Sequence, residues 1–149
     1  MSTPSIRRVS HLEILRAVNA RELIAEYAAE CSMPGAEPQA ETYAAMEHAG
    51  ALQCFGAYVA EELVGFVSVL TAVMPHNGKR MATVESLFVH PGHRGSGAGN
   101  DLLFAAEQYA DETECVAITQ TARIGSRLDR VLSRRAGSQP SHTVYTRWL

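Results

Sequence analysis

The stretch VHPGHRGSGAGNDLL, residues 89–103, decides how the rest of the chain is interpreted. It places four glycines, an arginine and two histidines between an apolar segment and a segment of helical spacing. Glycines leave backbone N–H groups uncovered, so that a ligand can approach the main chain. A helix N-terminus directly after them adds unsatisfied N–H groups and about half a positive charge. The stretch therefore predicts a loop that binds an anion, a phosphate first of all, with Arg94 adding a fixed charge at its rim.

Three apolar segments rich in β-branched and aromatic residues come before this loop. Two glutamates separate the first pair of segments, and the turn-forming residues PHNGK separate the second pair. Such segments favour strands, and the short breaks between them favour hairpins. We therefore expect an antiparallel meander of three strands, at residues 52–60, 63–73 and 81–89.

The segments after the loop predict a parallel crossover. Apolar residues recur at helical spacing from about Gly99, and the short apolar run CVAIT, residues 115–119, follows as a buried strand. A strand, a helix and a further strand in this order predict a parallel pair, so the sheet is mixed. We then expect a helix at residues 126–136 and a closing strand, HTVYTRWL, at residues 142–149.

The N-terminal third predicts helices. Ser10 and Glu13 have the spacing of a capping box, and apolar residues recur at helical spacing after them. Pro38 and Gly50 have the positions that start and stop a second, alanine-rich helix. We expect a short strand at residues 5–9, one helix over residues 11–30, and another between residues 38 and 50.

Bulk properties exclude several classes of protein. With 149 residues, 46% of them hydrophobic, the chain suits one domain spanning residues 1–149. A net charge of −3 without a dense run of Lys or Arg argues against a nucleic-acid partner, and mildly favours a cationic acceptor such as an amine. Cys31, Cys54 and Cys115 lack metal or redox spacing, so we expect reduced, packed thiols. With no signal peptide or membrane span, these features predict a cytoplasmic protein that binds no membrane and no metal.

The segment VESLFVHPGHRGSGAGNDLL, residues 84–103, resembles motif A of the GNAT superfamily of acyl-CoA-dependent N-acyltransferases. The signature of that family is a strand ending in V-x-P, followed by Q/R-x-x-G-x-G/A at the opening of a helix. Arg94, Gly97 and Gly99 match the signature position for position, and Val89 and Pro91 precede them. The resemblance extends over about residues 53–149, whereas the N-terminal helices carry no motif.

This resemblance implies an α/β fold with a mostly antiparallel sheet of about six to seven strands, flanked by about four helices. Its parallel pair, here residues 82–89 and 114–119, splays apart to admit the pantetheine arm of acetyl-CoA, the implied co-substrate. The diphosphate lies on backbone N–H groups of the loop, and pantetheine pairs with the preceding strand like an added strand. The implied coenzyme-binding residues are Leu87, Phe88, Val89, Arg94, Gly95, Ser96, Gly97, Ala98, Gly99 and Ser126.

Glu85 is the expected general base. An amine must lose a proton before it attacks the thioester, and a backbone N–H of the fourth strand is expected to stabilise the resulting oxyanion. In a regular strand Glu85 shares the face of Leu87 and Val89, where partial burial would strengthen the carboxylate as a base. A local bulge would instead turn it to solvent.

The general acid is open. Many family members have an Asn opening the last helix and a Tyr four residues before its terminal Gly, the Tyr serving as the acid. Ser126 and Ser133 occupy these positions here, and Ser138 replaces the aromatic residue after the Gly. Ser126 either hydrogen-bonds pantetheine or caps the helix, and Ser133 is a poor acid. Tyr145 on the last strand, water, or unassisted departure of the thiolate remain as alternatives.

Two other functions were weighed. A dinucleotide-binding oxidoreductase would need a third glycine where Asn100 stands, and no βαβαβ half follows. A non-catalytic acyl-CoA-binding or regulatory module of the same fold stays open because the tyrosine is missing. The acceptor amine is undetermined, with residues 27–40 and the turn at 74–80 expected around it. The final strand, exposed at the sheet edge, predicts a homodimer contact.

Overall fold

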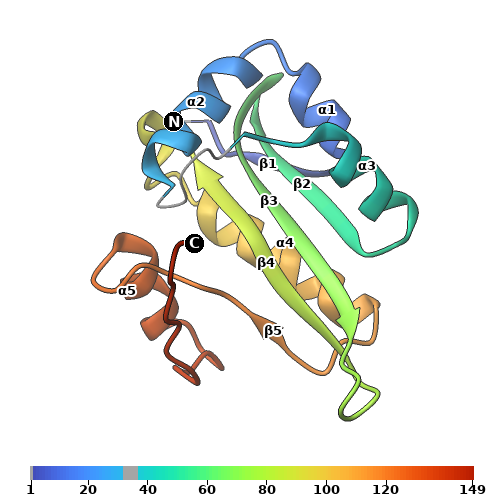
Figure 1. The fold of residues 1–149 in the computed structure, drawn as a ribbon. Helices are drawn as coiled ribbons and strands as arrows, with labels where there is room; N and C mark the ends of the chain where they lie inside the picture. The colour runs from blue at the N-terminus through green and yellow to red at the C-terminus, as the bar shows by residue number, and fades with distance from the viewer. Residues whose placement is uncertain (1, 32–36) are drawn as a thin grey trace.

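One mixed sheet organises the molecule (Figure 1). The computed structural model describes residues 2–31 and 37–149. Within this part of the chain the strand order is β1-β2-β3-β4-β5, antiparallel except for the parallel pair β4 and β5. The strands are β1 Ser5–Val9, β2 Leu52–Val59, β3 Glu62–Val73, β4 Arg80–Val89 and β5 Ile118–Thr119. The mixed α/β class is confirmed, with five strands in the described chain instead of six to seven.

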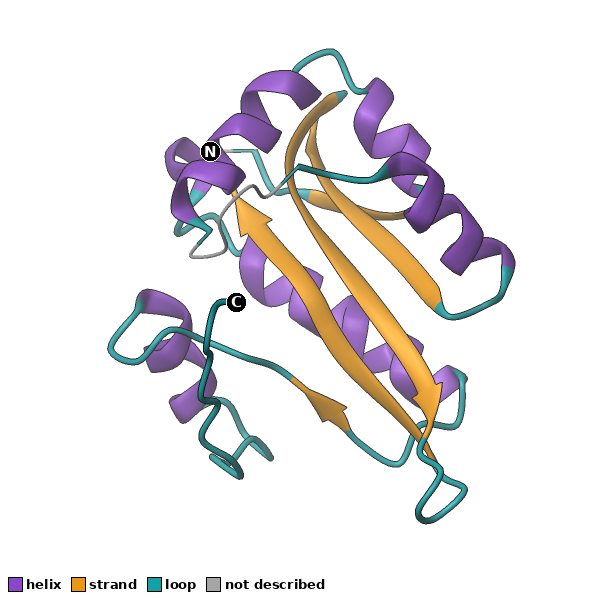
Figure 2. Cartoon of the chain, viewed as in Figure 1, coloured by secondary structure: helices purple, strands orange, loops and turns teal. Residues whose placement is uncertain are grey.

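Helices cover the two faces of the sheet separately (Figure 2). The side chains of α4 join one cluster with Val67, Val69 and Val84, and residues of α1 and α2 join the other with Phe66 and Phe88. The helices are α1 His11–Arg16, α2 Ala20–Glu30, α3 Ala40–His48, the 3-10 turn η1 Pro91–His93, α4 Ala98–Glu112 and α5 Arg127–Arg134. None of the helices in the described ranges is long and apolar enough to cross a membrane.

The single helix expected over residues 11–30 is two helices. The capping box of Ser10 and Glu13 forms as predicted and starts α1. The chain then turns extended at Ala17, and Asn19 before α2 donates a side-chain hydrogen bond of 2.7 Å to the Leu63 carbonyl. Helical periodicity continues through the break, which is why the sequence gives no sign of it. The contact of Asn19 with the start of β3 fixes where α2 begins.

The C-terminal strand expected at residues 142–149 is absent from the structure, which is described for all of these residues. Residues 138–149 are exposed and carry no assigned element, and Figure 2 draws them as loop. The strand expected at residues 115–119 is reduced to Ile118 and Thr119. Because α5 buries none of its residues, it offers no packed layer on which a further strand could assemble. The predicted dimer contact, which depended on that strand, loses its structural basis.

Leu102 anchors α4 on the sheet, because its side chain is fully buried (0% exposed) in the cluster of that face. We predict that Leu102→Ala lowers the free energy of unfolding by about 2–5 kcal/mol. Phe104 on the same helix is 56% exposed, and Phe104→Ala should change the free energy of unfolding by about 0.5 kcal/mol. Urea denaturation of both variants measures the difference, and equal losses would contradict the packing described.

Candidate functional site

β4 is paired along its length on one side and briefly on the other. It pairs with β3 from Arg80 to Val89, whereas β5 pairs in parallel with Ala82 and Thr83 alone. Beyond Thr83 no described strand borders this side of β4, and the chain after β5 runs away from it toward α5 (Figure 1). The backbone from Glu85 to Val89 therefore has a side that can pair with an extended ligand. Of the residues predicted there, Leu87 and Val89 are half-buried and Phe88 is buried.

A β-bulge places Glu85. Ser68 pairs with Ser86 and Val69 with Val84, so that Glu85 is an extra residue in β4 without a partner. The bulge reverses the alternation of side chains, and Val84 joins the α4 face with Leu87 and Val89. Glu85 is exposed on the other side, so the regular alternation that would have buried it among apolar neighbours does not apply. The alternative of a bulge is the one the structure adopts.

The hydroxyl of Tyr43 on α3 meets the Glu85 carboxylate. It donates to the carboxylate, with distances of 3.0 Å to Oε1 and 3.1 Å to Oε2. The ring of His11 stacks on the Tyr43 ring with centroids 3.7 Å apart and planes 5° apart. Neither residue was recognised from the sequence, because Tyr43 lies 42 positions from Glu85 and no motif connects them.

A small cavity lies beside these groups. Its volume is about 20 Å³, space for about one water molecule. The cavity is lined by His11, Ile14, Ile24, Tyr27, Pro38, Tyr43, Phe66, Ser68 and Ser86.

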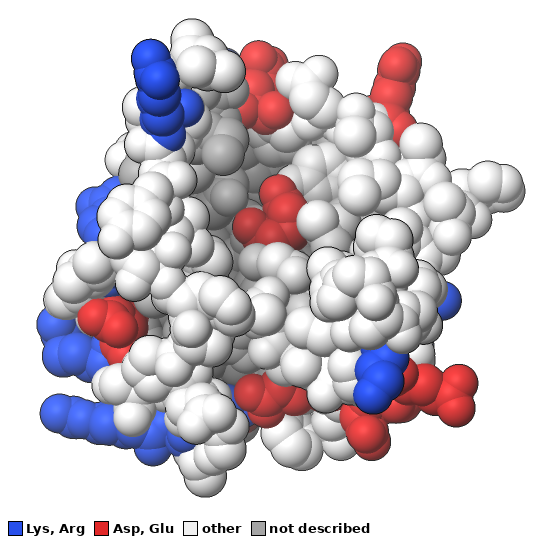
Figure 3. Space-filling view, turned by 60° about the horizontal axis from the view of Figure 1, so that its bottom comes forward, with Lys and Arg blue, Asp and Glu red and all other residues white. Residues whose placement is uncertain are grey.

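The face in Figure 3 is hollowed near its centre, where acidic side-chain atoms lie, and basic side chains gather along the edge toward α5.

The glycine loop presents its main chain. Gly95 and Gly97 have φ of +93° and +98°, a left-handed conformation that favours glycine, and Gly97 directly precedes α4. Ser96 accepts a hydrogen bond from the Ala98 amide through its hydroxyl. No described residue accepts a hydrogen bond from the amides of Gly95, Gly97, Gly99 and Asn100. Amides of this kind at a helix N-terminus are able to donate hydrogen bonds to an anion.

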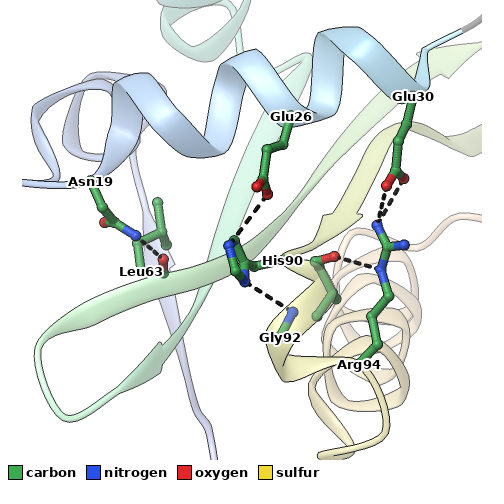
Figure 4. Close-up of polar contacts among 8 residues, drawn as sticks. Asn19, Glu26, Glu30, Leu63, His90, Gly92 and Arg94 are labelled. Atoms are coloured by element: carbon green, nitrogen blue, oxygen red, sulfur yellow. Dashed lines mark hydrogen bonds and ion pairs between the residues drawn. The ribbon is translucent and has the colours of Figure 1, made fainter.

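Arg94 is held by α2 instead of standing free at the rim of the loop (Figure 4). Its guanidinium donates to both carboxylate oxygens of Glu30 at 2.7 and 2.8 Å. Its Nε donates to the carbonyl of Val89 at 2.9 Å. Arg94 therefore fixes the end of β4 against α2, and the charge expected at the rim of the loop is paired with Glu30.

His90 makes a second contact between the loop and α2 (Figure 4). Its Nδ1 accepts a hydrogen bond from the Gly92 amide, and its Nε2 lies 3.4 Å from a carboxylate oxygen of Glu26. Glu22 also contributes an oxygen to this cluster, in which all three ligand atoms lie within 4.8 Å of one another. Because Nδ1 is an acceptor, Nε2 carries the ring proton and faces the Glu26 carboxylate.

The two contacts of α2 with the loop have the same spacing in both segments of the chain. Glu26 and Glu30 are four residues apart on α2, and their partners His90 and Arg94 are also four residues apart. The sequence contains this matching interval between two glutamates and between a histidine and an arginine, but nothing in it shows that α2 crosses the loop. His93 stands with its ring centroid 5.8 Å from that of His90.

The two serines at the positions of the family's Asn and Tyr, Ser126 and Ser133, hydrogen-bond within α5. The Ser126 hydroxyl accepts a hydrogen bond from the Asp129 amide at 3.1 Å and caps α5, one of its two expected roles. The Ser133 hydroxyl donates to the Arg130 carbonyl. Tyr145 is 91% exposed in the C-terminal segment. The guanidinium of Arg127 lies beside Gly95, 4.0 Å from the position of a Cβ added there.

A comparison with protein-family models identifies one family. A family model described as the acetyltransferase (GNAT) family matches residues 20–127. No curated protein sequence matches the chain.

Solved structures with this fold include a ribosomal-protein-alanine N-acetyltransferase from Brucella melitensis biovar Abortus. It is 22% identical, with 99% of each chain covered and a TM-score of 0.74. The structure of AAC(6')-Iy with the bisubstrate analogue CoA-S-monomethyl-acetylneamine is 18% identical, with 99% of each chain covered and a TM-score of 0.75. An aminoglycoside acetyltransferase from an uncultured soil metagenomic sample, in complex with trehalose, is 21% identical, with 97% of each chain covered and a TM-score of 0.72.

The left-handed conformation of Gly97 gives a direct test of the loop. An alanine at φ +98° is strained, so Gly97→Ala should lower the free energy of unfolding by about 1–2 kcal/mol. Gly99 is the control, because its φ is not positive and an added Cβ would meet Val89 at an ordinary 3.8 Å. Gly99→Ala should be neutral or slightly stabilising. Chemical denaturation measures the free energy of unfolding of both variants. Equal values would contradict the left-handed conformation of Gly97.

Proposed function

The chain belongs to the GNAT acetyltransferase family, and on that premise we propose that it transfers an acetyl group from acetyl-CoA to a primary amine. The observation that carries the proposal is the set of loop amides without a described acceptor, next to the side of β4 that β5 leaves unpaired. The bisubstrate analogue of CoA bound to AAC(6')-Iy supports an acyl-CoA donor for this fold.

The coenzyme is proposed to bind in two parts. Its diphosphate accepts hydrogen bonds from the amides between Arg94 and Gly99, where the dipole of α4 favours negative charge. Ser96 and Ala98 were predicted in the same loop, and their amides donate within it, Ser96 to the His93 carbonyl and Ala98 to the Ser96 hydroxyl. Pantetheine pairs with the backbone of Leu87, Phe88 and Val89, and Ser126 borders it from the cap of α5. Both parts use main-chain groups, so few cationic side chains are needed.

The chemistry is a direct attack in a ternary complex. The amine nitrogen attacks the thioester carbonyl while Glu85 takes a proton from it, directly or through one water. The oxyanion of the tetrahedral intermediate accepts a hydrogen bond from a backbone N–H of β4. The C–S bond then breaks and coenzyme A leaves as the thiolate. Exposure of Glu85 on the side of α3 leaves its carboxylate within reach of an incoming amine.

The acid that protonates the thiolate has three candidates: Tyr145, water, and none, if the thiolate leaves unassisted. Ser133 is exposed and bonded to its own helix, and Tyr145 lies in a segment without strand structure. Tyr145 stays a proposal, beside water and an unassisted thiolate. A non-catalytic acyl-CoA-binding module is the second candidate, and the serine in place of tyrosine is the observation that favours it.

Coenzyme binding is tested by ligand-induced stabilisation. Acetyl-CoA at about a hundred times its dissociation constant should raise the free energy of unfolding by about 2.7 kcal/mol. NADH at the same concentration should leave it unchanged. Stabilisation by NADH alone, or by neither compound, would contradict the proposal that acetyl-CoA is the acyl donor.

Catalysis is tested by thiol release with a panel of amines: an aminoglycoside, a polyamine, free lysine and a peptide with an N-terminal alanine. Glu85→Gln should lower turnover about 10²- to 10⁴-fold at neutral pH without weakening acetyl-CoA binding. An unchanged rate in this variant excludes Glu85 as the base. Binding of acetyl-CoA without thiol release on any amine would favour the non-catalytic module.

A further inference from the structure

Among the described residues, one side chain donates to Glu85, and it comes from another layer of the fold. The Tyr43 hydroxyl lies 3.0 and 3.1 Å from the two carboxylate oxygens. Glu85 is exposed and bulges out of β4, so without this contact its carboxylate would be free to sample several rotamers in solvent. The hydrogen bond from the Tyr43 hydroxyl therefore fixes the position of the Glu85 carboxylate.

Tyr43 is itself held in place by α1. Its ring stacks on the ring of His11, which is 7% exposed. The backbone N–H of His11 donates to Oε1 of Glu47 on α3 at 2.7 Å, which ties the two helices together one turn beyond Tyr43. A stacked ring between two joined helices has little freedom, so its hydroxyl is a fixed point for Glu85.

Burial favours the neutral forms of the two stacked rings, Tyr43 and His11. Burial and the neighbouring Glu85 raise the pKa of Tyr43 above its usual value, so the phenol keeps its proton at neutral and moderately alkaline pH. Burial lowers the pKa of His11, which favours a neutral ring beneath Tyr43. The titratable groups on neighbouring elements are Tyr27 and Cys54, each with its pKa raised to about 12 chiefly by burial, together with Cys31 and Glu47.

We propose that Tyr43 is a positioning residue for acyl transfer, which holds the bulged Glu85 carboxylate beside the cavity under α1, α2 and α3 so that it can take the proton of the amine. This rests on the proposed function, in which Glu85 is the base. Tyr43 acts through Glu85 and needs no contact with the coenzyme, whose proposed site begins at Leu87.

The variant Tyr43→Phe removes the hydroxyl and keeps the ring that stacks on His11. It should lower kcat about 10-fold and leave the KM for acetyl-CoA unchanged. Loss of a donor favours the protonated carboxyl, so the acidic limb of the kcat profile should move to higher pH. The control is Tyr109→Phe on α4, the opposite face of the sheet, which should keep the wild-type rate and profile. An unmoved profile in Tyr43→Phe would overturn the proposal.

A double variant separates positioning from an independent effect. If Tyr43 acts through Glu85, Tyr43→Phe adds no further loss to Glu85→Gln. Multiplicative losses in Tyr43→Phe/Glu85→Gln would assign Tyr43 a role of its own and overturn the proposal.

A spectroscopic measurement keeps the contact testable when none of the four amines is acetylated, an outcome that counts against the proposed function and not against the contact. In protein labelled with ¹³C at glutamate side-chain carboxyls, the Glu85 signal is assigned by its loss in Glu85→Gln. Its titration midpoint should lie higher in Tyr43→Phe than in wild type. Equal midpoints would show that the hydroxyl does not hold the carboxylate, whatever the reaction.

Discussion

The incomplete pairing of β4 is the constraint on which the rest of the structure depends. β3 fixes one side of this strand over its full length, whereas β5 leaves the other side after Thr83. The strand then runs into a loop where the amides of Gly95, Gly97, Gly99 and Asn100 lack described acceptors, and its end is held against α2 by Arg94 and Glu30. A main chain that is unpaired but rigidly supported is preorganised for an extended ligand with an anionic group at one end.

Local signals in the sequence predicted most of the elements that build this arrangement. The capping box at Ser10 and the cap at Ser126 each depend on residues within a few positions. The hairpin of β2 and β3 and the following strand were likewise recognisable from short apolar segments and their turns. Such features are predictable because their energetics are set by neighbours in the chain.

The features that were missed depend on contacts between distant segments. The bulge at Glu85 is a property of the register between β3 and β4, and its donor Tyr43 reaches it from α3. The pairing of Arg94 with Glu30 spans 64 positions. The last strand was wrongly predicted: the alternation in HTVYTRWL is typical of a strand, but the segment is exposed along its length and pairs with no described strand.

The central claim is that loop amides at the end of β4 bind the diphosphate of acetyl-CoA. A titration of ¹⁵N-labelled protein with acetyl-CoA, followed by amide chemical shifts, tests this claim most directly. The account predicts saturable changes that are largest at Gly95, Gly97, Gly99 and Asn100, with a second set at Leu87, Phe88 and Val89. Saturation with these amides unmoved, or no saturable change at all, would contradict it.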